Sequence, residues 1–127
     1  MLRPGEAVKR VLIVEDDAHL RRMFRALLEN EGFEVREAED GSQGLALVLS
    51  EAPDCIITDT MMPRMDGLAM LRRLAAVRPP VPSIMVTAAF DLPDDRQLKE
   101  LGVVKVFGKP FAFDRLVEAV RQAVQGS

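Results

Sequence analysis

Acidic and basic residues follow the apolar runs of this 127-residue chain at positions suited to phosphate chemistry. Glu15 and Asp16 come directly after one such run, and Asp59 comes directly after another. Thr87 and Lys109 follow two later runs. If the runs are parallel strands of one sheet, these side chains share the edge at which open α/β folds bind ligands. The sequence therefore predicts that three carboxylates, a hydroxyl group and an ammonium group gather at one site.

Three crowded carboxylates need a compensating positive charge, because they repel strongly and otherwise do not all stay ionised near neutral pH. A hard divalent cation such as Mg²⁺ takes oxygen ligands and commonly uses one or two carboxylates together with phosphate oxygens. We expect Asp16 and Asp59 to be direct ligands and Glu15 to hold a water molecule. Lys109, from a neighbouring strand, would add a point charge, and Thr87 would offer a hydroxyl donor. This set of groups suits phosphoryl transfer, in which a protein mainly positions groups and neutralises charge.

The carboxylate of Asp59 can also be the nucleophile. Its attack on a phosphoryl group would give an acyl phosphate, which stores enough free energy to shift a conformational equilibrium and resets it by hydrolysis. This chemistry favours a phosphoacceptor switch over an enzyme that turns over many substrate molecules.

Simpler structural interpretations exist for several of these residues. Taken alone, the acidic cluster 15–17 is typical of a helix N-terminus, where carboxylates cap backbone N–H groups. We interpret Met61 and Met62 as packing residues, and a hard cation would use the Met61 carbonyl oxygen instead of sulfur. His19, the one histidine, is interpreted as a solvated side chain. Cys55, in an apolar run, is expected to be a buried, inert thiol.

Extended and helical patterns alternate along the chain. The extended runs are 11–14, 33–38, 55–58, 84–86 and 103–107, and the helical patterns are 18–31, 44–51, 68–77, 94–101 and 113–124. Parallel strands need crossover connections, and helical crossovers cover both faces of a sheet. The alternation predicts an α/β fold with a doubly wound, five-stranded parallel sheet and helices on both faces. The expected domain spans 10–125, between an N-terminal tail at 1–9 and a C-terminal tail at 126–127.

Size and charge narrow the classes of function. A chain of 127 residues with 48% hydrophobic content can bury the core of one domain without disulfides or structural metal. The net charge of -3 is spread along the sequence, which gives no sign of direct binding to nucleic acid. No run approaches the roughly 18 apolar residues that a membrane span requires, and no signal-peptide pattern is present. We expect a soluble, cytoplasmic protein without direct contact to a membrane.

Four segments resemble the receiver domains of two-component response regulators, in the order and approximate spacing of that family. They are 14–17 (VEDD), 59–67 (DTMMPRMDG), 87–88 (TA) and 109–111 (KPF), and the resemblance extends from Val11 to Val124. It implies a flavodoxin-like strand order of 2-1-3-4-5. It also implies phosphorylation of Asp59 by a sensor histidine kinase or a histidine phosphotransfer protein, with Mg²⁺ as cofactor.

The resemblance also assigns roles to individual residues. Glu15 and Asp16 would form the acidic pair, the Met61 carbonyl oxygen would complete the metal site, and Thr87 and Lys109 would contact the phosphoryl group. The face made by the fourth helix, fifth strand and fifth helix would bind a downstream protein. The resemblance also allows a homodimer.

Val106 departs from the pattern of the family. Receivers usually carry tyrosine or phenylalanine three residues before the lysine, and that ring changes orientation together with the counterpart of Thr87. Successive side chains of a strand point to opposite faces, so Phe107 is not expected to replace the missing ring. The departure at Val106 therefore concerns the output step of the switch, and not the phosphoacceptor site.

Two other classes remain as alternatives. Phosphatases and phosphotransferases that form an aspartyl phosphate carry a second aspartate two residues after the nucleophile, which acts as acid and base. Met61 occupies that position here and cannot transfer protons, so turnover should be poor. The chain could also be the receiver part of a longer DNA-binding regulator, although no helix-turn-helix pattern follows Val124.

Overall fold

The computed structural model describes residues 7–89 and 91–125, in which five strands alternate with five helices. The strands are β1 (Arg10–Val14), β2 (Glu34–Ala38), β3 (Cys55–Thr58), β4 (Ser83–Thr87) and β5 (Val103–Gly108). The helices are α1 (Ala18–Asn30), α2 (Gly41–Ser50), α3 (Gly67–Ala75), α4 (Asp95–Glu100) and α5 (Phe113–Gln125). Most of the expected N-terminal tail, and all of the expected C-terminal tail at 126–127, lie outside the described residues.

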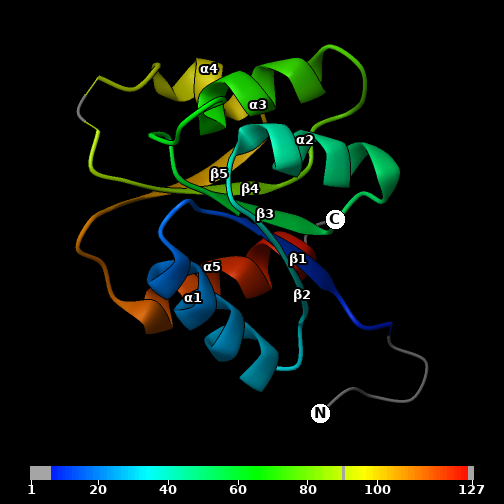
Figure 1. Ribbon diagram of the computed structural model, residues 1–127, viewed down its shortest axis with the longest axis vertical. Coiled ribbons are helices and arrows are strands. Elements are labelled where there is room, and N and C mark those ends of the chain that lie inside the picture. Colours follow the sequence, from blue (N-terminus) through cyan, green and yellow to red (C-terminus); the bar gives the residue numbers. More distant parts are fainter. Residues whose placement is uncertain (1–6, 90, 126–127) are drawn as a thin grey trace.

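The strands form one parallel sheet in the order β2-β1-β3-β4-β5, which confirms the predicted topology. Figure 1 shows α1 and α5 on one face of this sheet and α2, α3 and α4 on the other. A helix therefore connects each strand to the next strand in the chain, as parallel pairing requires. No helix within the described residues is long and apolar enough to cross a membrane.

Each face of the sheet carries its own hydrophobic core. In β1, Val11 and Ile13 face α1 and α5, whereas Leu12 and Val14 face α2 and α3. Because the central strands are covered on both faces, their side chains are buried without interruption, and this explains their continuous apolar runs. The edge strand β2 alternates instead between buried and exposed positions.

Two helix ends show how single residues set the boundaries. Gly32 follows α1 with φ of 93°, the left-handed conformation that glycine adopts freely and that commonly ends a helix. The predicted start of α2 at Gly44 is wrong, because the helix begins three residues earlier, at Gly41. Asp40 causes the earlier start, since its buried carboxylate caps the helix by accepting a hydrogen bond from the backbone N–H of Gln43 at 3.0 Å.

Candidate functional site

The acidic residues that follow β1 and β3 meet at the carboxyl edge of the sheet. The register pairs Val14 with Thr58, which places the residues after them side by side. The backbone N–H of Asp59 donates to the carbonyl oxygen of Val14 at 3.2 Å and so extends this pairing by one step. Carboxylate oxygens of Glu15, Asp16 and Asp59 all lie within 4.8 Å of one another. The structure thus brings together the three carboxylates that the sequence places after these strands.

Lys109 supplies the positive charge of the cluster. Its ammonium nitrogen lies 2.6 Å from Oδ2 of Asp59 and 3.3 Å from Oε1 of Glu15. The expectation that Lys109 comes from a strand next to the carboxylates is wrong, because β4 lies between β5 and β3. A lysine side chain is long enough to reach across that strand, and the backbone N–H of Lys109 is anchored on the carbonyl oxygen of Thr87 at 3.0 Å.

Burial and charge shift the pKa values within this cluster. Burial, together with a hydrogen bond to Asp16, raises the pKa of Glu15 to about 7, although the charge of Lys109 opposes the shift. Burial alone would lower the pKa of Lys109, but its hydrogen bond to Asp59 and the charge of Glu15 outweigh burial and raise it. Lys109 therefore stays protonated, whereas Glu15 is only part-ionised near neutral pH. One ammonium group does not fully compensate three carboxylates.

The donor set of this cluster fits a hard divalent cation. All three side chains offer carboxylate oxygens, which are the ligands that Mg²⁺ and Ca²⁺ prefer, and none offers sulfur or imidazole. Asp16 is exposed while Glu15 and Asp59 are buried, so a cation would have one side open for water or a phosphate oxygen. The raised pKa of Glu15 identifies the charge that a cation would stabilise.

Thr87 lies beside this cluster with its hydroxyl group already in use. The side chain is buried, its Oγ1 atom contacts Oγ1 of Thr60, and it accepts a hydrogen bond from the backbone N–H of Ala89 at 2.9 Å. Thr60 was missed by the sequence reasoning. Its side chain is buried next to Asp59, but in the sequence it is only a single hydroxyl residue beside an aspartate.

The loop between β3 and α3 lies against the Asp59 carboxylate. The backbone N–H of Met61 donates to Oδ1 of Asp59 at 3.1 Å, and the backbone N–H of Gly67 donates to the carbonyl oxygen of Thr60 at 3.3 Å. At Gly67 a Cβ atom would overlap the carbonyl oxygen of Asp59 and lie 2.8 Å from the hydroxyl oxygen of Thr58. The start of α3 is therefore packed directly on the candidate nucleophile.

The predicted packing role of Met61 is wrong, because its side chain is 67% exposed. A loop that directs its backbone toward the cluster leaves this side chain in solvent. Met62 is partly buried against the core formed with α2, α3 and α4, as expected. His19 is exposed, as predicted, and Asp17 caps α1, so the helix-cap interpretation of the acidic run is confirmed for its third member. Cys55 is buried, and burial raises the pKa of its thiol to about 12.

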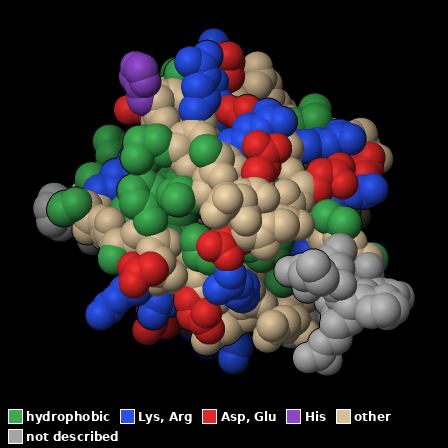
Figure 2. Space-filling view, turned by 90° about the horizontal axis from the view of Figure 1, so that it is seen from below, with side chains coloured by type: hydrophobic (Ala, Val, Ile, Leu, Met, Phe, Trp, Pro, Cys, Tyr) green, Lys and Arg blue, Asp and Glu red, His purple; other side chains and the backbone are tan. Residues whose placement is uncertain are grey.

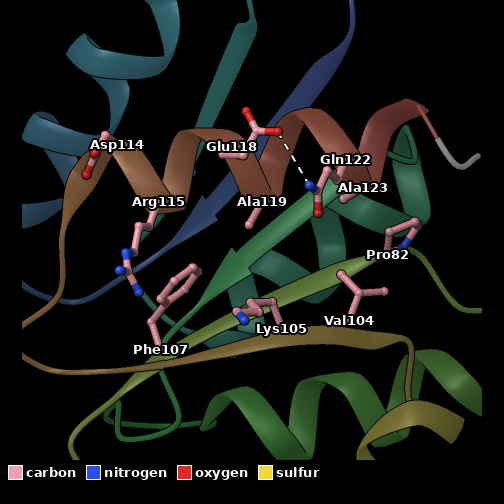
Figure 3. Close-up of a pocket in the computed structure, with 10 residues that line it drawn as sticks. All are labelled: Pro82, Val104, Lys105, Phe107, Asp114, Arg115, Glu118, Ala119, Gln122 and Ala123. Atoms are coloured by element: carbon pink, nitrogen blue, oxygen red, sulfur yellow. Dashed lines mark hydrogen bonds between the residues drawn. The ribbon is translucent and has the colours of Figure 1, made fainter.

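Val106 and Phe107 lie on opposite faces of β5, as strand alternation predicts. Val106 packs against the core on the α4 side and lines an open hollow of about 530 Å³ together with Leu98. Phe107 instead lines the groove between β5 and α5, near Lys105 (Figure 3). Its ring centroid lies 6.3 Å from that of Phe111. Phe107 therefore does not occupy the space next to α4 that the missing ring would fill.

The fold and this site together define a doubly wound α/β domain with a candidate site for a metal ion and phosphate at the carboxyl ends of its strands. The sequence model of the response regulator receiver domain matches residues 11–121. The chain therefore belongs to the response regulator receiver family. Receiver domains act as phosphoacceptor switches, bind Mg²⁺ at an acidic pocket and interact with histidine kinases or phosphotransfer proteins.

Individual relatives agree with this assignment. The chain is 37% identical over 117 residues to the C4-dicarboxylate transport transcriptional regulatory protein DctD of Rhizobium meliloti, covering 92% of this chain and 25% of that protein. It is 32% identical to sporulation initiation phosphotransferase F of Bacillus subtilis, covering 90% and 92%. A solved receiver domain structure, described as CheY-like, from Methanospirillum hungatei superposes with a TM-score of 0.86 at 29% identity, covering 94% and 96%. The chain thus spans a quarter of one relative and nearly all of another.

Magnesium is expected to stabilise this domain more at pH 8 than at pH 5.5. Glu15 has a pKa of about 7 in the folded protein, above the 4.5 of a free glutamate, so without metal its contribution to stability is lost as pH rises between these values. Mg²⁺ needs the ionised carboxylate, and a tenfold excess over its Kd adds about 1.4 kcal/mol, or roughly 4 °C in Tm. Thermal denaturation with Mg²⁺ or with a chelator measures both effects.

A Glu15→Gln variant separates the contribution of the Glu15 carboxylate to the pH dependence of Tm from those of other carboxylates that titrate in the same range. Its metal-free Tm should fall less between pH 5.5 and pH 8 than that of the parent. Asp16→Asn should weaken the response to Mg²⁺ at both pH values. An identical melting curve of the parent protein across millimolar Mg²⁺ at pH 8 would contradict the metal site.

Proposed function

We propose that this domain is an Mg²⁺-dependent phosphoacceptor and that Asp59 is the residue phosphorylated. The observation that carries the proposal is the buried Asp59 carboxylate, paired with Lys109 at 2.6 Å and adjoining two further carboxylates. A carboxylate oxygen of Asp59 attacks the phosphorus atom of the donor. A new P–O bond forms, the bond from phosphorus to the leaving group breaks, and the leaving group departs with its electron pair. The product is an acyl phosphate.

Each neighbouring residue has a role in this transfer. Lys109 neutralises charge on the phosphoryl oxygens, and the Thr87 hydroxyl donates a hydrogen bond to one of them. Glu15, Asp16, Asp59 and the Met61 carbonyl oxygen would hold Mg²⁺, which supplies further charge neutralisation when it is bound. Met61 offers no proton-transferring side chain two residues after the nucleophile, so we propose a switch that catalyses only its own phosphorylation and dephosphorylation.

The proposed donor is a sensor histidine kinase or a histidine phosphotransfer protein in the cytoplasm. The receiver family supports this proposal, because such proteins are the partners of the family. On the face seen in Figure 2 acidic and basic side chains are interspersed, with a hydrophobic patch among them. This mixed surface favours a protein partner over direct contact with nucleic acid or a membrane.

The proposed output surface is formed by α4, β5 and α5. Between β5 and α5 lies an open groove of about 640 Å³, into which Val104, Lys105 and Phe107 project from the strand (Figure 3). Arg115 and Glu118 line its other side. An edge strand beside such a groove suits a downstream protein or a second copy of the domain. The receiver unit proposed here covers residues 10–125.

Incubation with acetyl phosphate and Mg²⁺ tests the function directly. Intact-mass measurement should show addition of one phosphoryl group per chain, and hydroxylamine should remove it, because it cleaves acyl phosphates. A chelator should suppress the labelling. No added mass at millimolar Mg²⁺ and donor would contradict the proposal, and so would a product that resists hydroxylamine.

A Val106→Tyr substitution is expected to deepen the conformational response to phosphorylation. The hollow of about 530 Å³ beside Val106 can accept a ring between β5 and α4. Amide hydrogen exchange across 91–111 should then differ more between the phosphorylated and free protein than it does in the parent. Val106→Ala serves as the matched control, and labelling of Asp59 should be nearly unchanged in it. If the parent already shows a large difference to which tyrosine adds nothing, the domain switches without an aromatic residue here.

A further inference from the structure

Arg64 has a backbone conformation that its residue type does not explain. Its φ of 66° lies in the left-handed region, and within residues 7–89 and 91–125 it is the one non-glycine residue with positive φ. A side chain with a Cβ atom is disfavoured in this conformation, and glycine would adopt it freely. The strain indicates that the Arg64 side chain makes contacts that offset it.

Those contacts go to the buried carboxylate of Asp40. Both Nε and Nη2 of Arg64 lie 2.5 Å from Oδ2 of Asp40, which is 1% exposed. The other carboxylate oxygen, Oδ1, accepts the capping hydrogen bond from Gln43 at the start of α2. This backbone hydrogen bond and the Arg64 guanidinium together lower the pKa of Asp40, so the carboxylate is ionised at neutral pH.

A second contact joins the same two segments. The backbone N–H of Gly41 donates to the carbonyl oxygen of Met65 at 2.8 Å, and a Cβ atom at Gly41 would lie 2.5 Å from that oxygen. The loop that begins after Asp59 is thus held at two ends. Met61 holds it to the Asp59 carboxylate, whereas Arg64 and Met65 hold it to the N-terminus of α2.

We propose that the Arg64–Asp40 ion pair positions the Met61 carbonyl oxygen for Mg²⁺, and that Arg64 is therefore a positioning residue for the phosphoacceptor site. This inference rests on the proposed function, because it requires Mg²⁺ at the acidic cluster with the Met61 carbonyl oxygen among its ligands. Mg²⁺ demands a nearly ideal octahedron of oxygen atoms about 2.0–2.1 Å away, so small displacements of a ligand weaken binding. Residues that orient ligands commonly change metal affinity by about 10–100-fold when they are replaced.

The test is an Arg64→Gly variant, in which glycine accepts the backbone conformation and only the ion pair is lost. Isothermal titration calorimetry with MgCl₂ should show a Kd raised about tenfold, while Tm without metal should change little, because relief of the backbone strain opposes the loss of the ion pair to the buried Asp40 carboxylate. At saturating Mg²⁺ the rate of labelling by acetyl phosphate should return to that of the parent. The direction of the change in Kd distinguishes positioning from charge, because loss of a positive charge near an acidic site would by charge alone tighten Mg²⁺ binding.

Matched variants separate the effect of ligand positioning on Mg²⁺ affinity from the effect of charge. Arg73→Ala removes an exposed cation from α3 and should leave Kd unchanged or slightly lower. Asp40→Asn keeps an oxygen to cap α2 but loses the charge, and it should weaken Mg²⁺ binding. The double variant Arg64→Gly with Asp40→Asn should be little weaker than either single variant. If the parent binds Mg²⁺ and Arg64→Gly binds it equally or more tightly, this inference is overturned and the proposed function stands. If the parent binds no Mg²⁺, both are overturned.

Discussion

Replacement of Asp59 by alanine is expected to reduce labelling by acetyl phosphate from one phosphoryl group per chain to none. The substitution removes the one carboxylate that lies after β3 and contacts Lys109 at 2.6 Å. Glu15 also contacts Lys109, but its carboxylate is part-protonated near neutral pH, which makes it a poor substitute nucleophile. Intact-mass measurement after incubation with donor and Mg²⁺ gives the result directly.

The control for this variant is Asp54→Ala. Asp54 precedes the same strand at its other end, where its carboxylate accepts a hydrogen bond from the backbone N–H of Arg10 at 2.8 Å. This variant should be labelled as fully as the parent, even if it is less stable. Equal labelling of Asp59→Ala and the parent would show that another residue is the acceptor.

A Gly67→Ala variant is expected to lose about 3 kcal/mol of stability, the upper end of the usual cost of overpacking. The added methyl group would overlap the carbonyl oxygen of Asp59 and lie 2.8 Å from the Thr58 hydroxyl oxygen. This carbonyl belongs to buried backbone directly after β3, held by the hydrogen bond from the Asp59 N–H to Val14, and it cannot move aside as the end of a flexible side chain can. For a domain of this size the loss corresponds to a fall in Tm of roughly 10 °C. Thermal or denaturant unfolding measures it.

Gly108→Ala is the matched control for stability, because no atom lies within 4 Å of the position of its Cβ atom. Its φ is also outside the positive range, so alanine should be neutral or slightly stabilising there. An equal loss of stability in both variants would mean that the close approach at Gly67 does not cause the destabilisation. A Gly67→Ala protein that keeps its Tm would show that α3 can shift away from Asp59.

Much of this architecture could be predicted from the sequence because burial leaves a clear pattern. The strands covered on both faces gave unbroken apolar runs, and the polar residues just beyond them marked the carboxyl edge of the sheet. Glu15, Asp16 and Asp59 were found in this way, and the structure brings their carboxylates together. The strand order could not be predicted from periodicity. It came instead from the family resemblance.

Contacts between loops were not predictable in the same way. The role of Asp40 was not predicted, because its pairing with Arg64 depends on a loop 24 positions away. Thr60 was missed because a single hydroxyl group beside an aspartate has no periodic signature. Met61 was assigned to the core from its apolar side chain, although backbone hydrogen bonding places that side chain in solvent.

The contact between the hydroxyl groups of Thr60 and Thr87 bears on how sharply the domain can respond. If a phosphoryl group on Asp59 accepts a hydrogen bond from the Thr87 hydroxyl, that bond replaces the contact with Thr60, so the number of hydrogen bonds does not increase. A hydrogen bond to a charged group contributes about 1 kcal/mol more than a neutral one. That difference changes a two-state ratio by roughly fivefold, which is far from the 10⁴-fold of a complete transition. On the proposed mechanism, this exchange at Thr87 would therefore shift the equilibrium without completing the transition.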